Sequence, residues 1–176
     1  MLKCAPMNRL KTLGLATVLL LLASLAFSEE PAPPKFFDVS HRPPKAPLPV
    51  TATVKDVAAV NILKIENEIS IRLLGIAPSH KIEIRRNAID YLVTEIKGKK
   101  IHLEYDKKLK DEFGRLLVYV FVIDKNGTQA QDPIQEDLIW RGYAYASSKY
   151  PCKKLRRFRA YEKSSKKERN GLWEGL

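Results

Sequence analysis

The sequence predicts an α+β fold in which a five-stranded Greek-key β-barrel is accompanied by three helices. Two observations indicate this class. Short runs rich in β-branched and aliphatic residues occur five times between residues 50 and 124. Three longer segments have apolar residues at near-helical spacing, and glycines lie at their ends. The first helical segment divides three strands from two, and such runs of strands broken by one helix are typical of α+β proteins.

Three strands open the predicted barrel. They cover residues 50–57, 60–65 and 69–76, and the turn candidates DVAA and ENE separate them. Their residues either alternate between apolar and polar or form a short aliphatic run, as strand residues do. A helix follows over residues 81–100, with apolar residues on one face and Gly98 at its end.

Two further strands complete the set. Residues 101–106 and 115–124 have the β-branched and aromatic composition of strands, and residues 107–114 form a turn-bearing connection between them. Five short strands in this order fit a barrel of the OB type.

Two helices close the chain. The second predicted helix covers residues 132–144, with Asp132 as N-cap, Pro133 at its first position and Gly142 at its end. The third covers residues 152–173 and stops at Asn170-Gly171.

Residues 1–28 have the pattern of a secretory signal peptide. Basic residues without an acid precede an apolar stretch over residues 13–27, and Ala26-Phe27-Ser28 is a small-x-small site. The apolar stretch is shorter than the ~20 residues that span a bilayer. We therefore expect cleavage after Ser28, no stable membrane span afterwards, and a periplasmic, cell-envelope or secreted protein.

Residues 29–49 form a proline-rich linker before the domain of residues 50–176. Proline fixes φ and has no amide donor, so an extended, semi-rigid spacer is expected. Phe36 and Phe37 could dock this spacer on the domain, and His41 is expected to be a solvated linker histidine.

Cysteine and charge content restrict the partners. Loss of Cys4 with the signal peptide leaves Cys152 alone, so no internal disulfide is possible and this thiol is expected to be a packing residue. The net charge of +11 includes three from Lys3, Arg9 and Lys11, so cleavage leaves +8. This balance favours a polyanion such as DNA or RNA, bound by a monomer.

Arg72 and Arg115 are candidate phosphate ligands. Each lies at the start of a predicted strand, and Arg115 follows Gly114 in an Asp-x-aromatic-Gly-Arg arrangement. Planar guanidinium groups pair bidentately with phosphate oxygens and stabilise negative charge in a phosphodiester transition state. Strand alternation alone would place Arg72 on a solvent face. Asp106 and Asp111 could pair with these arginines or with the lysines of residues 107–110.

At this point the chain resembles the staphylococcal nuclease (thermonuclease) family over roughly residues 50–173. Four segments in order are similar to that family's motifs: IRLLGI with its proline-containing loop, LEYDKKLKDEFGRLLVYVFV, DLIWRGYAY and YEKSSKKERNGLW. The resemblance implies an OB-fold barrel with three helices and, in active members, Ca²⁺-dependent cleavage of nucleic acid.

The metal-binding positions depart from the family pattern. Ala58 and Ala77 stand where that family has the two aspartates that hold Ca²⁺, and His80 stands at the position of its glutamate base. Ca²⁺ takes 6 to 8 oxygen ligands, and methyl groups supply none. Asp56 is the only residual candidate, so no cofactor is predicted. His80 could still act as a base, or ligate a softer metal with Asp56, or be a solvated loop residue.

A basic segment after residue 150 is a second candidate contact for nucleic acid. A basic helical face with nearby aromatic rings can follow a phosphate backbone while bases stack, although such a face is usually only solvated. The residues proposed for this contact are Tyr150, Lys153, Lys154, Arg156 and Arg157.

Three functions remain open from the sequence. The first is an exported thermonuclease-like protein that is catalytically impaired, a pseudoenzyme, with a retained arginine-lined pocket for phosphate or nucleic acid. The second is an active phosphodiesterase that uses Arg72, Arg115 and His80 in a rearranged site. The third is a cell-envelope interaction module that uses the fold only as a scaffold.

Overall fold

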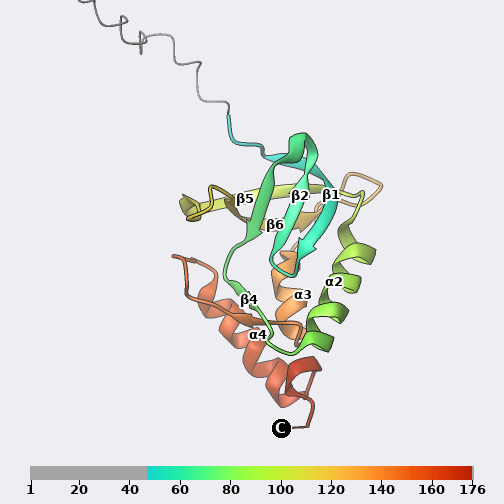
Figure 1. The fold of residues 1–176 in the computed structure, drawn as a ribbon, viewed down its shortest axis with the longest axis vertical. Helices are drawn as coiled ribbons and strands as arrows, with labels where there is room; N and C mark the ends of the chain where they lie inside the picture. The colour runs from blue at the N-terminus through green and yellow to red at the C-terminus, as the bar shows by residue number, and fades with distance from the viewer. Residues whose placement is uncertain (1–46, 176) are drawn as a thin grey trace, which may run out of the picture. The chain divides into compact units, whose positions relative to one another are not determined.

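The computed structural model describes residues 47–175 (Figure 1). Within this range five strands form a closed barrel in the order β1-β2-β3-β6-β5. Their bounds are β1 Thr51–Ala59, β2 Ile62–Ile65, β3 Ser70–Leu73, β5 Lys100–Lys110 and β6 Leu116–Val122. The predicted signal peptide, Phe36, Phe37 and His41 lie outside the described residues.

The barrel closes through one parallel contact. β3 pairs with β6 in parallel, so that Arg72 lies opposite Leu117, and every other neighbouring pair of barrel strands is antiparallel. The helices α2 (Ile82–Ile96), α3 (Ile134–Trp140) and α4 (Leu155–Lys167) accompany the barrel, with 3₁₀ turns at Glu66–Glu68 and Gly171–Trp173. The predicted α+β class and OB-like barrel are confirmed for this range.

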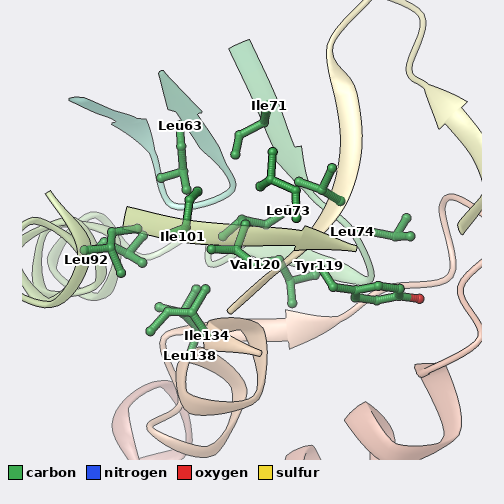
Figure 2. Packing of buried hydrophobic residues seen from close by; sticks show 14 of the residues in the cluster. Leu63, Ile71, Leu73, Leu74, Leu92, Ile101, Tyr119, Val120, Ile134 and Leu138 are labelled. Atoms are coloured by element: carbon green, nitrogen blue, oxygen red, sulfur yellow. The ribbon is translucent and has the colours of Figure 1, made fainter. Parts of the chain in front are cut away.

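The core fills the barrel and extends under the helices (Figure 2). Alternation along β3 puts Ile71 and Leu73 inside, where both are fully buried, and it leaves Arg72 on the outer side. From α2 only one side enters the core, with Ala88, Leu92 and Ile96 buried. Full burial of one such aliphatic side chain contributes roughly 1.5–3 kcal/mol.

The third predicted strand is interrupted at Gly75. Residues 69–76 do not form one strand, because β4 (Ile76–Pro78) leaves the barrel and pairs with β7 (Ala144–Ala146). Gly75 has a φ of +81°, and a Cβ there would lie 2.6 Å from the Phe158 ring and 2.7 Å from Cys152 Sγ. Only glycine permits this bend and this close approach.

The predicted connection between the last two barrel strands is shorter than expected. β5 runs to Lys110, so residues 107–110 are strand rather than loop. The turn itself is made by Asp111, whose Oδ1 accepts hydrogen bonds from the amides of Phe113 (2.9 Å) and Arg115 (3.0 Å). Such side-chain caps are the reason that aspartate initiates turns.

The start of α3 also differs from the prediction. Pro133, not Asp132, is the N-cap, and no side chain caps the helix. The Asp132 carboxylate instead pairs with Arg157 of α4. α3 is fixed to the barrel by Gln135, which is fully buried, donates to the Val118 carbonyl (2.9 Å) and accepts from the Val120 amide (3.2 Å).

The last helix begins later than predicted, at Leu155 rather than at residue 152, and Phe158 is its main core contact. The C-terminal 3₁₀ turn is fixed by a bond from the Leu172 amide to the Gly142 carbonyl (3.0 Å). Leu48, which belongs to the predicted linker, packs against the core. Within residues 47–175 no helix is long and apolar enough to cross a membrane.

Candidate functional site

Arg72 and Arg115 converge on one carboxylate. Arg115 Nε lies 2.7 Å from Asp111 Oδ2, and Arg72 Nη1 lies 3.6 Å from the same oxygen. The Asp111 side chain is fully buried, whereas the two arginine side chains retain 15% and 18% of their exposure. The fold therefore brings together the two predicted phosphate ligands, Arg72 of β3 and Arg115 directly before β6. Both remain partly accessible to solvent.

The charge of Asp111 is stabilised by its surroundings. Burial would raise the pKa of this carboxyl, but hydrogen bonds from the Arg115 side chain and from the Arg115 and Phe113 amides outweigh burial and lower the pKa. An ionised Asp111 facing two guanidinium groups leaves one net positive charge in the trio. Arg115 uses only its Nε in the short contact, so its terminal nitrogens remain available to a ligand.

Tyr150 lies under three cations. The charged groups of Arg72, Lys108 and Lys149 are 5.4, 4.8 and 5.2 Å from its ring centroid. The tyrosine is only 6% exposed, and its hydroxyl donates to Glu112. The structure thus does not support the predicted stacking of a base on Tyr150, because its ring is already covered. The residue instead gathers positive charge beside Arg72.

Glu112 balances part of that charge. It accepts a hydrogen bond of 2.7 Å from Lys149 Nζ. This bond, followed by the one from Tyr150, lowers the pKa of Glu112 to about 2. The carboxylate is therefore charged at any physiological pH, and it anchors Lys149 near the site.

Phe113 is the residue that sequence reasoning missed. It is 73% exposed at the tip of the β5–β6 turn, and the Arg115 guanidinium lies 4.7 Å from its ring centroid. A single exposed aromatic ring is not unusual in itself, but this ring lies next to one of the two candidate phosphate ligands. The signal was present in the Asp-x-aromatic-Gly-Arg motif, where the aromatic position falls inside a turn that cannot be buried.

The residues that the sequence resemblance assigns to metal-binding positions do not fit a Ca²⁺ ion. Asp56 is exposed and pairs with Lys97 Nζ at 3.1 Å; this hydrogen bond is the main reason its pKa is lowered. Ala58 lies at an irregularity of β1, and Ala77 is in β4. Among residues 47–175 no three His, Cys, Asp or Glu side chains are grouped as metal ligands. One lysine-paired carboxylate cannot supply the oxygens that Ca²⁺ requires.

His80 lies in the loop between β4 and α2 and is exposed. Its neighbour Ser79 is buried and accepts a hydrogen bond of 3.1 Å from the Lys81 amide, which shapes the loop. Within the described range no hydrogen bond or ion pair joins His80 to Arg72 or Arg115. Its predicted catalytic role stays a prediction.

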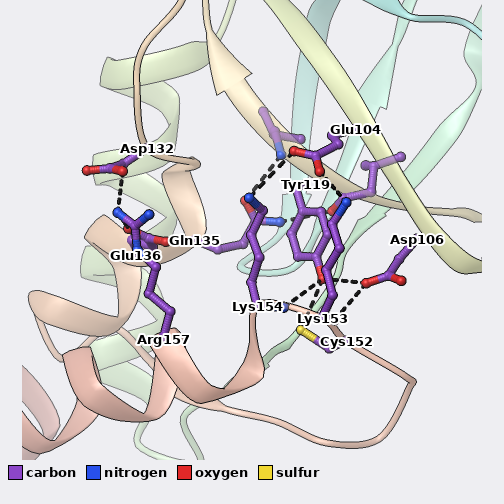
Figure 3. A network of polar contacts seen from close by, with 12 residues as sticks. Glu104, Asp106, Tyr119, Asp132, Gln135, Glu136, Cys152, Lys153, Lys154 and Arg157 are labelled. Carbon is purple, nitrogen blue, oxygen red and sulfur yellow. Dashed lines mark hydrogen bonds and ion pairs between the residues drawn. The ribbon is translucent and has the colours of Figure 1, made fainter.

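The basic segment before and within α4 is largely paired with acids (Figure 3). Lys153 and Lys154 both contact Glu104, the latter at 3.6 Å, and Arg157 contacts Asp132 and Glu136. Arg156 is exposed and has no ion pair with residues 47–175. The charge of this segment is thus partly neutralised, and nucleic-acid binding by these four residues stays a prediction.

Cys152 belongs to the same surface. The Tyr119 hydroxyl donates to Asp106 Oδ2 at 2.7 Å and lies 3.2 Å from Cys152 Sγ (Figure 3). Burial is the main cause of the raised pKa of the thiol. A thiol with a raised pKa is a poor nucleophile, which agrees with the predicted packing role.

The comparison with known families covers most of this domain. No curated protein matches the chain. The family described as staphylococcal nuclease homologue matches residues 70–175, a range that contains both arginines, the Asp111 turn and all three helices but begins after Asp56 and Ala58. The chain therefore belongs to the staphylococcal nuclease homologue family.

Proposed function

We propose that this domain binds single-stranded nucleic acid at Arg72 and Arg115 and has little or no Ca²⁺-dependent hydrolytic activity. The observation that carries the proposal is the convergence of two partly exposed guanidinium groups on a single carboxylate, with no set of oxygen donors for a divalent ion among residues 47–175. The family is one of nucleases, which agrees with a polyanion partner.

Three features favour a phosphate ligand at this site. Asp111 engages one nitrogen of each arginine, so most of their N–H donors can turn to a phosphate. Lys108 and Lys149 lie over Tyr150 beside Arg72 and extend the positive surface. Phe113 offers an exposed ring on which a base can stack, with ~1–3 kcal/mol per base typical of such contacts.

Binding is the first test. We expect full-length protein to bind a fluorescent 12-nucleotide single-stranded DNA in a fluorescence-anisotropy titration, and Arg72→Ala and Arg115→Ala each to weaken binding about tenfold or more. Arg86→Ala, an exposed arginine of α2, is the charge-matched control and should change the affinity less than twofold. Equal effects of all three variants would show that only net charge matters.

Cleavage is the second test. Hydrolysis of single-stranded DNA and of RNA should stay at background with Ca²⁺, Zn²⁺ or a chelator. The triple variant Ala58→Asp, Ala77→Asp, His80→Glu restores the family's carboxylates and should gain Ca²⁺-dependent cleavage if their loss is the cause of impairment. Metal-dependent cleavage by the unaltered protein, abolished in Arg115→Ala, would instead establish the active phosphodiesterase.

If the protein neither binds nor cleaves nucleic acid, the cell-envelope interaction module is the remaining function. We further propose export, with removal of residues 1–28. Its support is the signal-peptide pattern of the sequence. Sequencing the N-terminus of the protein recovered from the cell envelope or medium tests it, with Glu29 as the expected first residue.

A further inference from the structure

A groove separate from the arginine site runs along α2. Two adjoining hollows of about 330 and 360 Å³ share Asn87 and Tyr143 as lining residues. The first lies between the start of α2, the end of α3 and the C-terminal turn, and the second continues along α2 past Tyr91. No residue of the arginine site lines either hollow, so this groove has no role in the proposed function.

Three aromatic residues, Trp140, Tyr91 and Tyr143, line the groove and form its aromatic wall. Trp140 is 43% exposed, although a large aromatic side chain is ordinarily buried. The Arg141 guanidinium lies 4.6 Å from the Tyr91 ring centroid and 5.9 Å from that of Trp140. The rings of Tyr91 and Tyr143 are 5.7 Å apart. These contacts fix the orientation of the wall and leave the Trp140 ring open to a ligand.

Polar groups of both kinds surround this wall, and of these Arg141 already interacts with Tyr91. Within the described part of the chain, the side chains of Asn87, Asp90 and Glu174 make no hydrogen bond or ion pair, and Arg141 has no carboxylate within 4.0 Å. The amide both donates and accepts, the carboxylates accept and the guanidinium donates. One cation faces two carboxylates here, so a polyphosphate would meet more repulsion than attraction.

From this combination we infer that the groove binds a neutral oligosaccharide. A pyranose has one apolar C–H face, which can lie on the Trp140 ring, and a rim of hydroxyls that both donate and accept hydrogen bonds. Asn87, Arg141 and Glu174 offer the matching planar groups around the ring. The second hollow past Tyr91 provides room for the next sugar of a chain. This inference does not depend on nucleic-acid binding at Arg72 and Arg115.

Isothermal titration calorimetry with chitohexaose and with cellohexaose tests the inference on the full-length protein. At least one of these β-1,4-linked hexasaccharides is expected to bind. Trp140→Ala should weaken that binding about tenfold, which is about 1.4 kcal/mol, because it removes the aromatic face on which the sugar stacks. Asn87→Ala should weaken it several-fold. Both residues are on the surface, so folding should be retained, which circular dichroism checks.

Phe113→Ala is the control, because it removes an exposed aromatic ring, 73% exposed against 43% for Trp140, from the other site. It should leave oligosaccharide affinity unchanged and weaken binding of the 12-nucleotide DNA. Trp140→Ala should weaken oligosaccharide binding and leave the affinity for this DNA unchanged. No binding of either hexasaccharide up to millimolar concentration would overturn the inference, as would equal affinity in Trp140→Ala. Loss of DNA binding in Trp140→Ala would show instead that the groove is a nucleic-acid surface. Failure of DNA binding alone would affect only the proposed function.

Discussion

At the scale of single residues, Asp111 determines how the candidate site is arranged. Its Oδ1 closes the β5–β6 turn through two amides, and its Oδ2 faces both arginines. One side chain therefore couples the local turn to the geometry of the phosphate ligands. The motif showed an aspartate and an arginine close in sequence. The sequence left the arginines as one of several possible partners of Asp111, and the structure shows that Arg72, 39 positions before Asp111, contacts the same carboxylate as Arg115.

Asp111→Asn tests this coupling through stability. Because the folded state lowers the pKa of Asp111, its stabilising contribution is present above its ordinary pKa and is lost as pH falls through the lowered value. We expect Asp111→Asn to lower the free energy of unfolding at pH 7 by ~1–3 kcal/mol, and this difference to shrink below about pH 4. Urea titrations at pH 7 and pH 3 measure it. Asp90→Asn, an exposed aspartate, is the control, and a pH-independent difference would contradict the argument.

Gly75→Ala tests the bend between β3 and β4. Two costs add there, the positive φ and the contact of a Cβ with Phe158 and Cys152. Gly98→Ala is a matched control, since its φ of +77° is similar but nothing lies within 4 Å of the added Cβ. Thermal unfolding should show a loss of ~1–2 kcal/mol for Gly98→Ala and clearly more for Gly75→Ala. Equal losses would mean that the packing against α4 adjusts without cost.

At the scale of elements, α3 and α4 are joined by a buried carboxylate. Glu136 of α3 is 2% exposed, and its Oε2 lies 2.9 Å from Arg157 Nη2 of α4 (Figure 3). The two groups are not aligned for a hydrogen bond, and among residues 47–175 neither Glu136 oxygen has another partner. Burial is the main cause of the raised pKa of Glu136, and Arg157 only partly offsets it. The ion pair therefore orients the helices and adds little stability.

Glu136→Gln tests the upward shift of the Glu136 pKa through its effect on stability. A raised pKa means that ionising Glu136 costs more in the folded than in the unfolded state, so this group's contribution falls as pH rises from its ordinary value through the raised one. The glutamine variant should be as stable as the unaltered protein or more so at pH 7, and relatively less stable near pH 4. Chemical denaturation at both values, with Glu168→Gln as the exposed control, tests it. A large loss at pH 7 would show that the ion pair dominates.

At the scale of the whole molecule, neighbouring acids neutralise some basic side chains more than others. Arg157 contacts two acids, Asp132 and Glu136, whereas Lys153 and Lys154 share Glu104 and Arg72 and Arg115 share Asp111. Lys108, over the Tyr150 ring, has no ion pair among residues 47–175. The count of 31 lysines and arginines thus overstates the positive charge that a polyanion meets, and the net charge of +11, from which the 20 acids are already subtracted, is the better measure. Long-range attraction of a polyanion depends on the net charge of the protein, and specificity depends on the basic side chains that are free to contact phosphate.

Salt dependence measures how many of these groups meet phosphate. If Arg72, Arg115 and Lys108 each neutralise one phosphate, the slope of log K against log salt for single-stranded DNA should be about −2, and each alanine variant should reduce its magnitude by about 0.7. Anisotropy titrations between 50 and 300 mM KCl, roughly, cover the range where such slopes are read. Variants of Lys153 or Arg157 that changed the slope as much as Arg115→Ala would show that the paired helix also binds.

What the sequence by itself determined was the local content: five barrel strands, three helices, the arginine motif, and the missing carboxylates at Ala58 and Ala77. The strands, the helices and the arginine motif follow from side-chain periodicity and residue type, which are local properties. The carboxylates missing at Ala58 and Ala77 are implied only by the resemblance to the nuclease family. Only the tertiary structure decided the rest. It showed that β3 and β6 pair in parallel, that Arg72 reaches Asp111, that Tyr150 is covered and Phe113 exposed, and that Asp132 pairs with Arg157 instead of capping α3. Each depends on contacts between residues distant in the chain, which no local pattern specifies.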